Sequence, residues 1–195
     1  MFATLIATIA LGLAPAQDAK PQPLACAVMG SPVSAKSTAL DYAGVRYSFC
    51  CPGCDKAFEK DPQAAIKSPD VKGKVIGVSL FDPVSGLRIK PKKDTLWSDY
   101  EGVRYHFASD ENKKAFDADA KTFAKAPEKE ALYCAVMDHA VASYEAAGGY
   151  VDHEGVRYYI CCAACMGKMK GDAGKYAAGA AKAVKKPATL AVKKA

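Results

Sequence analysis

The sequence predicts an α+β fold built from three small ββα units in tandem. The tetrapeptide Gly-Val-Arg-Tyr occurs three times in matching surroundings, beginning at Gly44, Gly102 and Gly155. A repeat of this kind indicates a repeated structural unit. Each copy opens an alternating run typical of a short strand, and Cys-Ala-Val-Met stands upstream of the first and third copies. Each unit therefore begins with an opening turn and continues into a strand.

Within a unit, the local signals follow one order. An opening turn and an apolar segment precede a Gly-centred turn and a Val-x-Tyr-x-Phe run, which together predict a hairpin. The polar segments 55–60 and 111–116 follow the first two hairpins, and their periodic aromatics predict a short helix. Asp61-Pro62 predicts the end of the first helix.

These signals set the boundaries of the units. The first unit spans 24–66, the middle unit 76–124 and the third unit 131–177, with short linkers predicted between them. A Lys/Ala-rich tail predicted to be disordered occupies 178–195. A unit of this size buries too little surface to be stable alone. Metal ligation, disulfides or packing among the units must add stability.

The N-terminus predicts export. Residues 1–16 carry no charge and end in Ala14-Pro15-Ala16, the pattern of a secretory signal cleaved after Ala16. The stretch is too short to cross a bilayer, so we expect no transmembrane segment after cleavage. A buried N-terminal helix is the alternative. Export predicts a periplasmic or secreted location.

The charge is concentrated at the C-terminal end. The chain has a net charge of +6, but the segment 168–195 alone holds eight lysines and one acid. The rest of the chain is close to neutral, which argues against specific nucleic-acid binding. The tail could contact an anionic partner, or it could be a solvated end.

Eight cysteines form two groups that match the repeat. The first unit has Cys26, then Cys50-Cys51-Pro-Gly-Cys54, and the third unit has Cys134, then Cys161-Cys162-Ala-Ala-Cys165. A tetrahedral sulfur site needs ligands from turns that are distant in sequence, and a hairpin followed by a helix start supplies such turns. The repeated spacing therefore predicts two metal sites.

These residues resemble the YHS and TRASH-type metal-binding domains. Phe49-Cys50 to Cys54 matches their Phe-Cys-x-x-x-Cys signature, Ile160-Cys161 to Cys165 matches with Ile for Phe, and the segment 105–109 keeps the aromatic strand without cysteines. The resemblance covers most of 24–176. It implies a treble-clef-like, zinc-ribbon-like ββα fold that binds a transition or heavy metal, usually without catalysis.

The opening turns depart from that family. Many members have Asp-Pro-Val-Cys-Gly there, whereas this chain has Cys-x-x-Met, which adds Met29 and Met137 to the candidate ligands. Thiolate with thioether is a soft donor set that favours Cu(I) over Zn(II). Both ions are candidates, and the alternative for the methionines is packing in a small core.

Two questions about the cysteines stay open. A site could use Cys50 with Cys54 or the closer Cys51-x-x-Cys54 pair, and the same choice exists for Cys161 and Cys162 with Cys165. Structural disulfides are the alternative to metal, because an exported protein meets an oxidising compartment.

The middle unit has lost the ligand set. The positions equivalent to Cys26, Met29, Cys50, Cys51 and Cys54 are Asp82, Ser85, Ala108, Ser109 and Asn112. We expect this unit to be a scaffold and His106 to be a packing or surface residue. His139 could supplement the third unit's site or lie in a solvated turn.

The sequence favours an exported, non-catalytic protein that sequesters, delivers or senses a metal, with a metal transporter or chaperone as a candidate partner. It contains no phosphate loop, no His-Glu-x-x-His and no nucleophile elbow, so we expect no enzyme activity. A thiol-disulfide oxidoreductase using the Cys-x-x-Cys pairs is one alternative. A cysteine-stabilised interaction module is another.

Overall fold

Each Gly-Val-Arg-Tyr copy begins the second strand of an antiparallel hairpin. A computed structural model describes residues 20–34 and 36–192, and the predicted signal peptide lies outside them. The hairpins are β1 (Thr38–Tyr42) with β2 (Val45–Phe49), β4 (Leu96–Tyr100) with β5 (Val103–Phe107), and β9 (Gly149–His153) with β10 (Val156–Ile160).

The three hairpin turns share one backbone conformation. Both central residues have positive φ, with 52° and 79° at Ala43-Gly44, 45° and 79° at Glu101-Gly102, and 48° and 75° at Glu154-Gly155. Two consecutive positive φ angles define the turn whose twist matches that of the strands, and glycine adopts this conformation at little cost. The glycine of the repeated tetrapeptide is therefore a turn residue.

Two short helices follow every hairpin. They are α1 (Cys54–Lys60) and α2 (Pro62–Ile66), α3 (Asp110–Ala118) and α4 (Ala120–Phe123), and α5 (Ala163–Gly171) and α6 (Ala173–Ala180). Asp61, Asp119 and Asp172 each end one helix and accept a backbone hydrogen bond as the N-cap of the next. The sequence predicted one helix per unit, and these caps divide the helical segment.

One side chain of each first helix packs on its hairpin. Phe58 lies 4.9 Å from Tyr47, and Phe116 lies 4.9 Å from Tyr105, between ring centroids. Met169, four residues after Cys165, takes the equivalent place and is fully buried. This methionine is therefore a core residue of the third unit.

A shared sheet joins the first two units. Strand β3 (Gly77–Ser79) pairs antiparallel with β2 and parallel with β5, which makes a six-stranded sheet in the order β11-β1-β2-β3-β5-β4. The predicted α+β class is confirmed. The first two units are not joined only by a linker, because strand pairing makes their hairpins continuous.

The third unit has its own sheets. Strand β6 (Lys129–Ala131) pairs parallel with β10, giving the order β6-β10-β9, and β7 (Tyr133–Cys134) pairs with β8 (His139–Ala140). Its core also takes in Leu80 and Phe81 from the middle unit. Two single-turn 3-10 helices complete the connections, η1 (Pro69–Val71) and η2 (Tyr144–Ala146).

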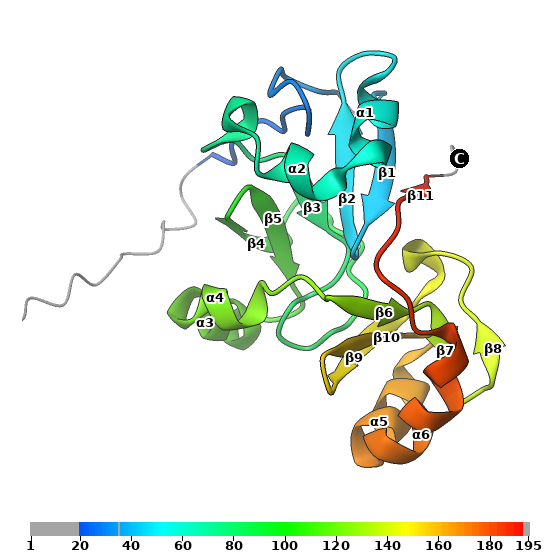
Figure 1. Cartoon of the computed structure of the whole chain (residues 1–195). Helices are drawn as coiled ribbons and strands as arrows, with labels where there is room; N and C mark the ends of the chain where they lie inside the picture. The colour runs from blue at the N-terminus through cyan, green and yellow to red at the C-terminus, as the bar shows by residue number, and fades with distance from the viewer. Residues whose placement is uncertain (1–19, 35, 193–195) are drawn as a thin grey trace, which may run out of the picture.

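The C-terminal segment follows a defined path, which differs from the disordered tail that its composition predicted. After α6 and the 3-10 helix η3 (Ala181–Ala183), Lys185 and Glu130 exchange backbone hydrogen bonds of 2.9 and 2.8 Å. Strand β11 (Leu190–Ala191) then pairs with β1 (Figure 1). The pairing satisfies the free backbone groups at a sheet edge, a tertiary gain that composition does not record. Within the described residues, every helix is too short or too polar to cross a membrane.

Candidate metal centre

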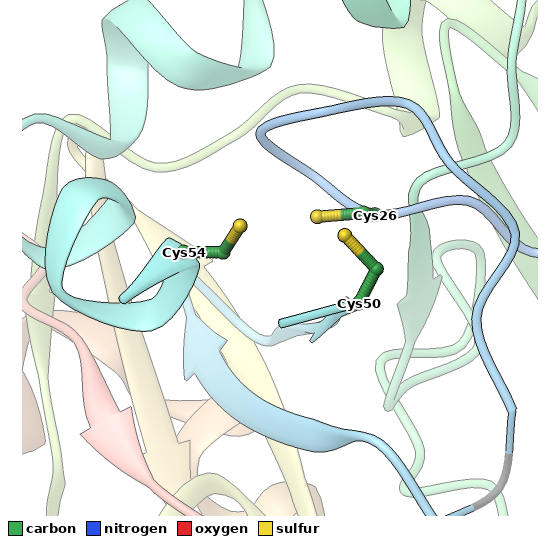
Figure 2. A group of neighbouring side chains, drawn as sticks. All are labelled: Cys26, Cys50 and Cys54. Carbon is green, nitrogen blue, oxygen red and sulfur yellow. The ribbon is translucent and has the colours of Figure 1, made fainter. Parts of the chain in front are cut away.

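Three thiols of the first unit meet from three different elements. Cys26 lies on the opening turn, Cys50 directly follows β2, and Cys54 is the first residue of α1. Their sulfur atoms all lie within 4.8 Å of one another, and Figure 2 shows them around a shared space. Cys26 and Cys54 are buried whereas Cys50 is exposed. The group is thus anchored in the core and open on one side.

Cys51 belongs to the same neighbourhood. Its Sγ atom lies 2.8 Å from that of Cys54, so both adjacent cysteines approach the helix thiol. A disulfide has an S–S length of about 2.05 Å, and all eight cysteines are free thiols here. Both Cys50 and Cys51 therefore lie close enough to Cys54 to share a metal with it, and the two alternatives from the sequence stay open.

The third unit repeats this arrangement with more donors. Cys134 ends β7, Cys161 follows β10, and Cys162 is the N-cap of α5. Cys161 Sγ lies 3.2 Å from Cys134 Sγ and 3.7 Å from Cys165 Sγ. Cys161, Cys162 and Cys165 form a group whose sulfur atoms all lie within 4.8 Å of one another.

His139 joins this site through strand pairing. It lies opposite Cys134 in the β7-β8 ladder, and opposite residues of an antiparallel pair place their side chains on one face. Cys134, His139 and Cys161 form a second group with ligand atoms within 4.8 Å. The imidazole Nδ1 contacts the Ala140 carbonyl oxygen at 2.9 Å, which leaves Nε2 available to a metal. The sequence left the role of this histidine open.

Hydrogen bonds favour the thiolate form of the two opening cysteines. Burial raises the pKa of Cys26, but backbone N–H groups, chiefly those of Met29 and Cys50, lower it by more, so its pKa lies below the usual value. The pKa of Cys134 is lowered in the same way, with burial opposed by the N–H groups of Cys161 and Met137. The thiolate is the form that binds metal, so the opening cysteines of the first and third units are prepared to act as ligands.

The neighbouring thiols have the opposite tendency. Hydrogen bonding to Cys26 raises the pKa of Cys50, and burial with hydrogen bonding to Cys134 raises that of Cys161. Burial raises the pKa of Cys165 to about 11. A cation bound between these thiols would stabilise their thiolate forms and lower their pKa values.

The four methionines within the described part of the chain divide into two pairs. Met29 and Met137 are 58% and 60% exposed, and the backbone N–H of Met29 donates to Cys26 Sγ at 3.5 Å. Their role as thioether ligands stays a prediction. Met166 and Met169 are buried in the core of the third unit, where they pack as apolar side chains.

Hydrogen bonds replace the thiols in the middle unit. Asp82 is fully buried at the position of the opening cysteine, and its Oδ2 accepts bonds from Ala108 N–H at 2.9 Å and Asn112 Nδ2 at 2.6 Å. Its Oδ1 accepts from the N–H groups of Val84 and Ser85. These hydrogen bonds join the opening turn, the residue after β5 and the first turn of α3 without a metal. The sequence revealed these equivalent positions but not their bonds.

The donor chemistry of the two thiol groups fits a soft or borderline cation. Zinc binds thiolate at about 2.3 Å, so two sulfurs on one tetrahedral ion stand about 3.8 Å apart. The 3.7 Å separation of Cys161 Sγ and Cys165 Sγ matches this value, and the 3.2 Å separation of Cys161 Sγ and Cys134 Sγ is shorter. None of the three donor groups found among the described residues contains a carboxylate, the ligand that hard cations prefer.

Fold and site together define a thiol-rich protein whose cysteine clusters suggest metal binding. Comparison with known families places a YHS domain, a member of a metal-binding domain family, at residues 80–127. This match lies on the middle unit, which contains none of the cysteines. No curated protein and no solved structure matches the chain. The family resemblance is therefore confirmed for the middle segment, and the flanking thiol clusters are the candidate metal sites.

Proposed function

We propose that this protein is an exported, non-catalytic carrier that binds a soft transition metal at two thiol clusters and serves sequestration, delivery or sensing. The observation that carries the proposal is the convergence of Cys26, Cys50 and Cys54 within 4.8 Å. In this proposal the three segments are related treble-clef-like units. The middle one is a scaffold, and the other two hold metal.

Copper(I) and zinc(II) are the proposed ions. Thiolate groups suit both, and a thioether from Met29 or Met137 would favour copper(I). Buried cysteines hold each cluster in the core while Cys50, Cys51 and Cys162 are exposed. An exposed thiol can be approached by a second protein, which supports exchange with a metal transporter or chaperone.

Export is supported by the composition of residues 1–16. A protein in the periplasm or outside the cell meets metal ions directly, without the thiol buffers of the cytosol. Membrane fractionation and N-terminal sequencing of the native protein would test this part of the proposal. A mature N-terminus at Gln17 is the expected result, and an intact Met1 in the cytosolic fraction would contradict it.

The central experiment measures metal and thiols together. The chain from Gln17 onward is purified reduced and without chelator, and elemental analysis is combined with a count of reactive thiols before and after chelation. We expect bound copper or zinc and thiols that react only after the chelator is added. The double variant Cys54→Ser and Cys165→Ser should lose most of the metal.

A control variant tests whether a hydroxyl added to the two helices is enough to change metal binding. Ala57→Ser and Ala164→Ser place a hydroxyl on exposed positions of the same two helices and leave every thiol intact. This control should bind as the unmodified chain does. Full binding by the cysteine double variant would contradict the proposal.

A thiol-disulfide oxidoreductase is the second candidate. Cys162 is exposed at the N-cap of α5, and hydrogen bonding to Cys165, through its backbone N–H and its thiol, lowers the pKa of Cys162. Its thiolate would attack a substrate disulfide and release one substrate thiolate. Cys165 would then displace the second, so that two electrons pass to the substrate and an intramolecular disulfide forms. Insulin reduction that is lost in Cys162→Ser would support this candidate, and its absence in the unmodified chain would exclude it.

A further inference from the structure

The opening turns of the two thiol clusters differ at two positions, Gly30 against Asp138 and Ser31 against His139. The turns align as Cys26-Ala-Val-Met-Gly-Ser31 and Cys134-Ala-Val-Met-Asp-His139, so Ser31 stands where the third unit has a histidine. The backbone is the same in both, because Ala25 pairs with Pro32 as Tyr133 pairs with Ala140. His139 therefore adds a donor to a turn whose backbone pairing is the same in both units.

This addition changes the number of donors available. The first unit gathers its four cysteines, which one tetrahedral ion can accept. The third unit gathers the same four positions together with His139, one donor more than a tetrahedral ion holds. A single ion would leave one of these donors without a metal.

The donors of the third unit also divide geometrically. One group is Cys134, His139 and Cys161, and the other is Cys161, Cys162 and Cys165. Each has its ligand atoms within 4.8 Å of one another, and the only shared atom is Cys161 Sγ. A thiolate sulfur has several lone pairs and can bind two cations at once. Cu(I), a soft ion, accepts low coordination numbers, so three donors suffice for it.

The burial of the donors in the third unit is compatible with two bound ions that share one sulfur. Cys134 and Cys165 are buried, one in each group, and fix the two ends of the cluster. Cys161 is half-buried between them, and His139 and Cys162 are exposed. Each ion would thus have one fixed ligand, one shared ligand and one ligand at the surface.

We propose, building on the metal-binding function above, that the third unit binds two Cu(I) ions bridged by Cys161 Sγ, with His139 as a ligand of the first ion and Cys162 as a ligand of the second. The first unit, with Ser31 in place of the histidine, binds one ion. The thiols release their protons to the solvent as the cations bind, and no electron transfer is involved.

The test is a stoichiometric titration of the full chain from Gln17 onward. The reduced protein is titrated anaerobically with Cu(I) against a colorimetric Cu(I) chelator, and bound copper per chain is measured by elemental analysis. X-ray absorption of the loaded protein records whether one copper scatters from another. We expect about three ions per chain and a copper-copper signal.

Four variants test which ion each proposed ligand binds. His139→Ser copies the turn of the first unit at an exposed position, and it should bind about two ions and lose the copper-copper signal. Cys162→Ser should also bind about two, whereas Cys161→Ser should bind about one because it removes the shared ligand. The triple variant Cys26→Ser, Cys50→Ser and Cys54→Ser should bind about two and keep the signal.

The results that would contradict the bridged pair of ions differ from those that would contradict metal binding itself. About two ions in the unmodified chain, with no change in His139→Ser, would overturn the bridged pair and leave metal binding intact. Loss of only one ion in Cys161→Ser would overturn the bridge. A chain that binds no copper would overturn both proposals.

Discussion

Asn112 Nδ2 donates a 2.6 Å hydrogen bond to Asp82 Oδ2, and these two residues occupy the positions that Cys54 and Cys26 hold in the first unit. A neutral amide and a carboxylate thus join the opening turn to the helix start where thiols do so elsewhere. The middle unit therefore connects its opening turn to its helix by hydrogen bonds and without thiols.

Asp82→Ala tests this connection. Asp82 is fully buried and accepts four hydrogen bonds, three of them from backbone N–H groups. Leaving buried donors unpaired is costly, so we expect the free energy of unfolding to fall by about 3 kcal/mol in urea denaturation. Asp110→Ala, which removes an exposed carboxylate from α3, should change it by less than about 1 kcal/mol. Equal effects of the two variants would contradict the interpretation.

Metal removal should act unevenly along the chain. A chelator should increase hydrogen exchange at the opening turns 26–31 and 134–139, because their thiols lose the cation that links them to the helices. Exchange in the β4-β5 hairpin should not change, because Asp82 secures that unit without a metal. Hydrogen exchange with mass spectrometry, with and without chelator, measures both regions in one sample. Uniform deprotection would contradict the prediction.

Thiols grafted onto the middle unit should create a metal site there. The triple variant Asp82→Cys, Ala108→Cys and Asn112→Cys restores the cysteine positions of the first unit on an equivalent hairpin and helix. We expect bound metal to rise by about one ion per chain, measured by elemental analysis. Asp82→Ser with Asn112→Ser is the control without thiols. No rise in a folded triple variant would show that the two frames differ.

His106 should make the protein sensitive to acid. The side chain is 9% exposed, and burial, with a smaller contribution from Arg104, lowers its pKa from 6.5 to about 4. The unfolded chain therefore binds more protons between these values, so stability falls as the pH drops from 6.5 towards 4. The loss is at most about 3 kcal/mol. Urea denaturation of His106→Gln should show a flatter pH dependence over this range, and an unchanged slope would contradict the assignment.

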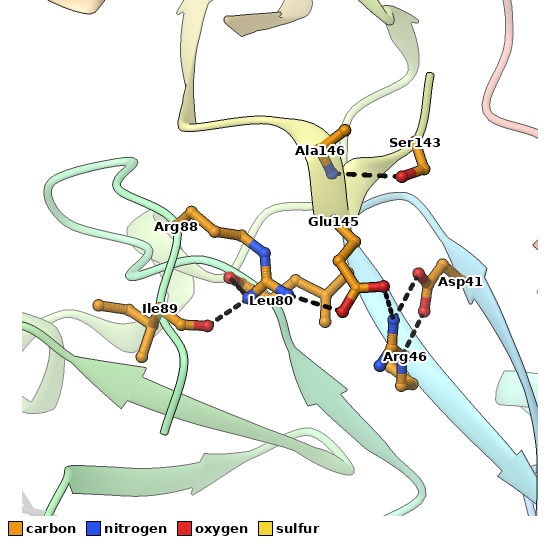
Figure 3. A network of polar contacts seen from close by, with 8 residues as sticks. All are labelled: Asp41, Arg46, Leu80, Arg88, Ile89, Ser143, Glu145 and Ala146. Carbon is orange, nitrogen blue, oxygen red and sulfur yellow. Dashed lines mark hydrogen bonds and ion pairs between the residues drawn. The ribbon is translucent and has the colours of Figure 1, made fainter. Parts of the chain in front are cut away.

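Glu145 links the three units through two arginines (Figure 3). Its carboxylate lies 3.6 Å from Arg46 of the first unit and 4.0 Å from Arg88 of the middle unit. Arg46 also donates to the buried Asp41 at 2.8 and 3.0 Å. We expect removal of the two carboxylates to lower the free energy of unfolding by different amounts, because the Glu145 side chain is 50% exposed and that of Asp41 is 4% exposed.

Two variants compare these carboxylates. Glu145→Gln should lower the free energy of unfolding by less than about 1 kcal/mol, and the effect should vanish at high salt. Asp41→Ala should lower it by about 2 kcal/mol at any salt concentration, because it leaves a paired guanidinium without its partner. Urea denaturation at two ionic strengths measures both. A salt-dependent effect of Asp41→Ala would contradict this assignment.

The repeat explains how much of the fold could be predicted. Three copies of one tetrapeptide placed the hairpin turns, and the Asp five residues before each repeated arginine forms a two-bond pair with it at Asp41, Asp99 and Asp152. The cysteine spacing likewise predicted which thiols would meet, because a hairpin and the following helix are local structures. The hairpins and their ion pairs depend on residues that are close in the chain, whereas the meeting of the opening cysteine with the other thiols was indicated by the repeated spacing.

Tertiary structure alone decided the rest. The pairing of β3 with β2 and β5, and the return of β11 to β1, join segments that no local pattern relates. The approach of His139 to Cys161 depends on the register of a two-residue strand pair and on the path of β10. The sequence by itself determined the units and their thiol clusters, whereas long-range strand pairing decided how the units share sheets and which histidine reaches the thiols of the third unit.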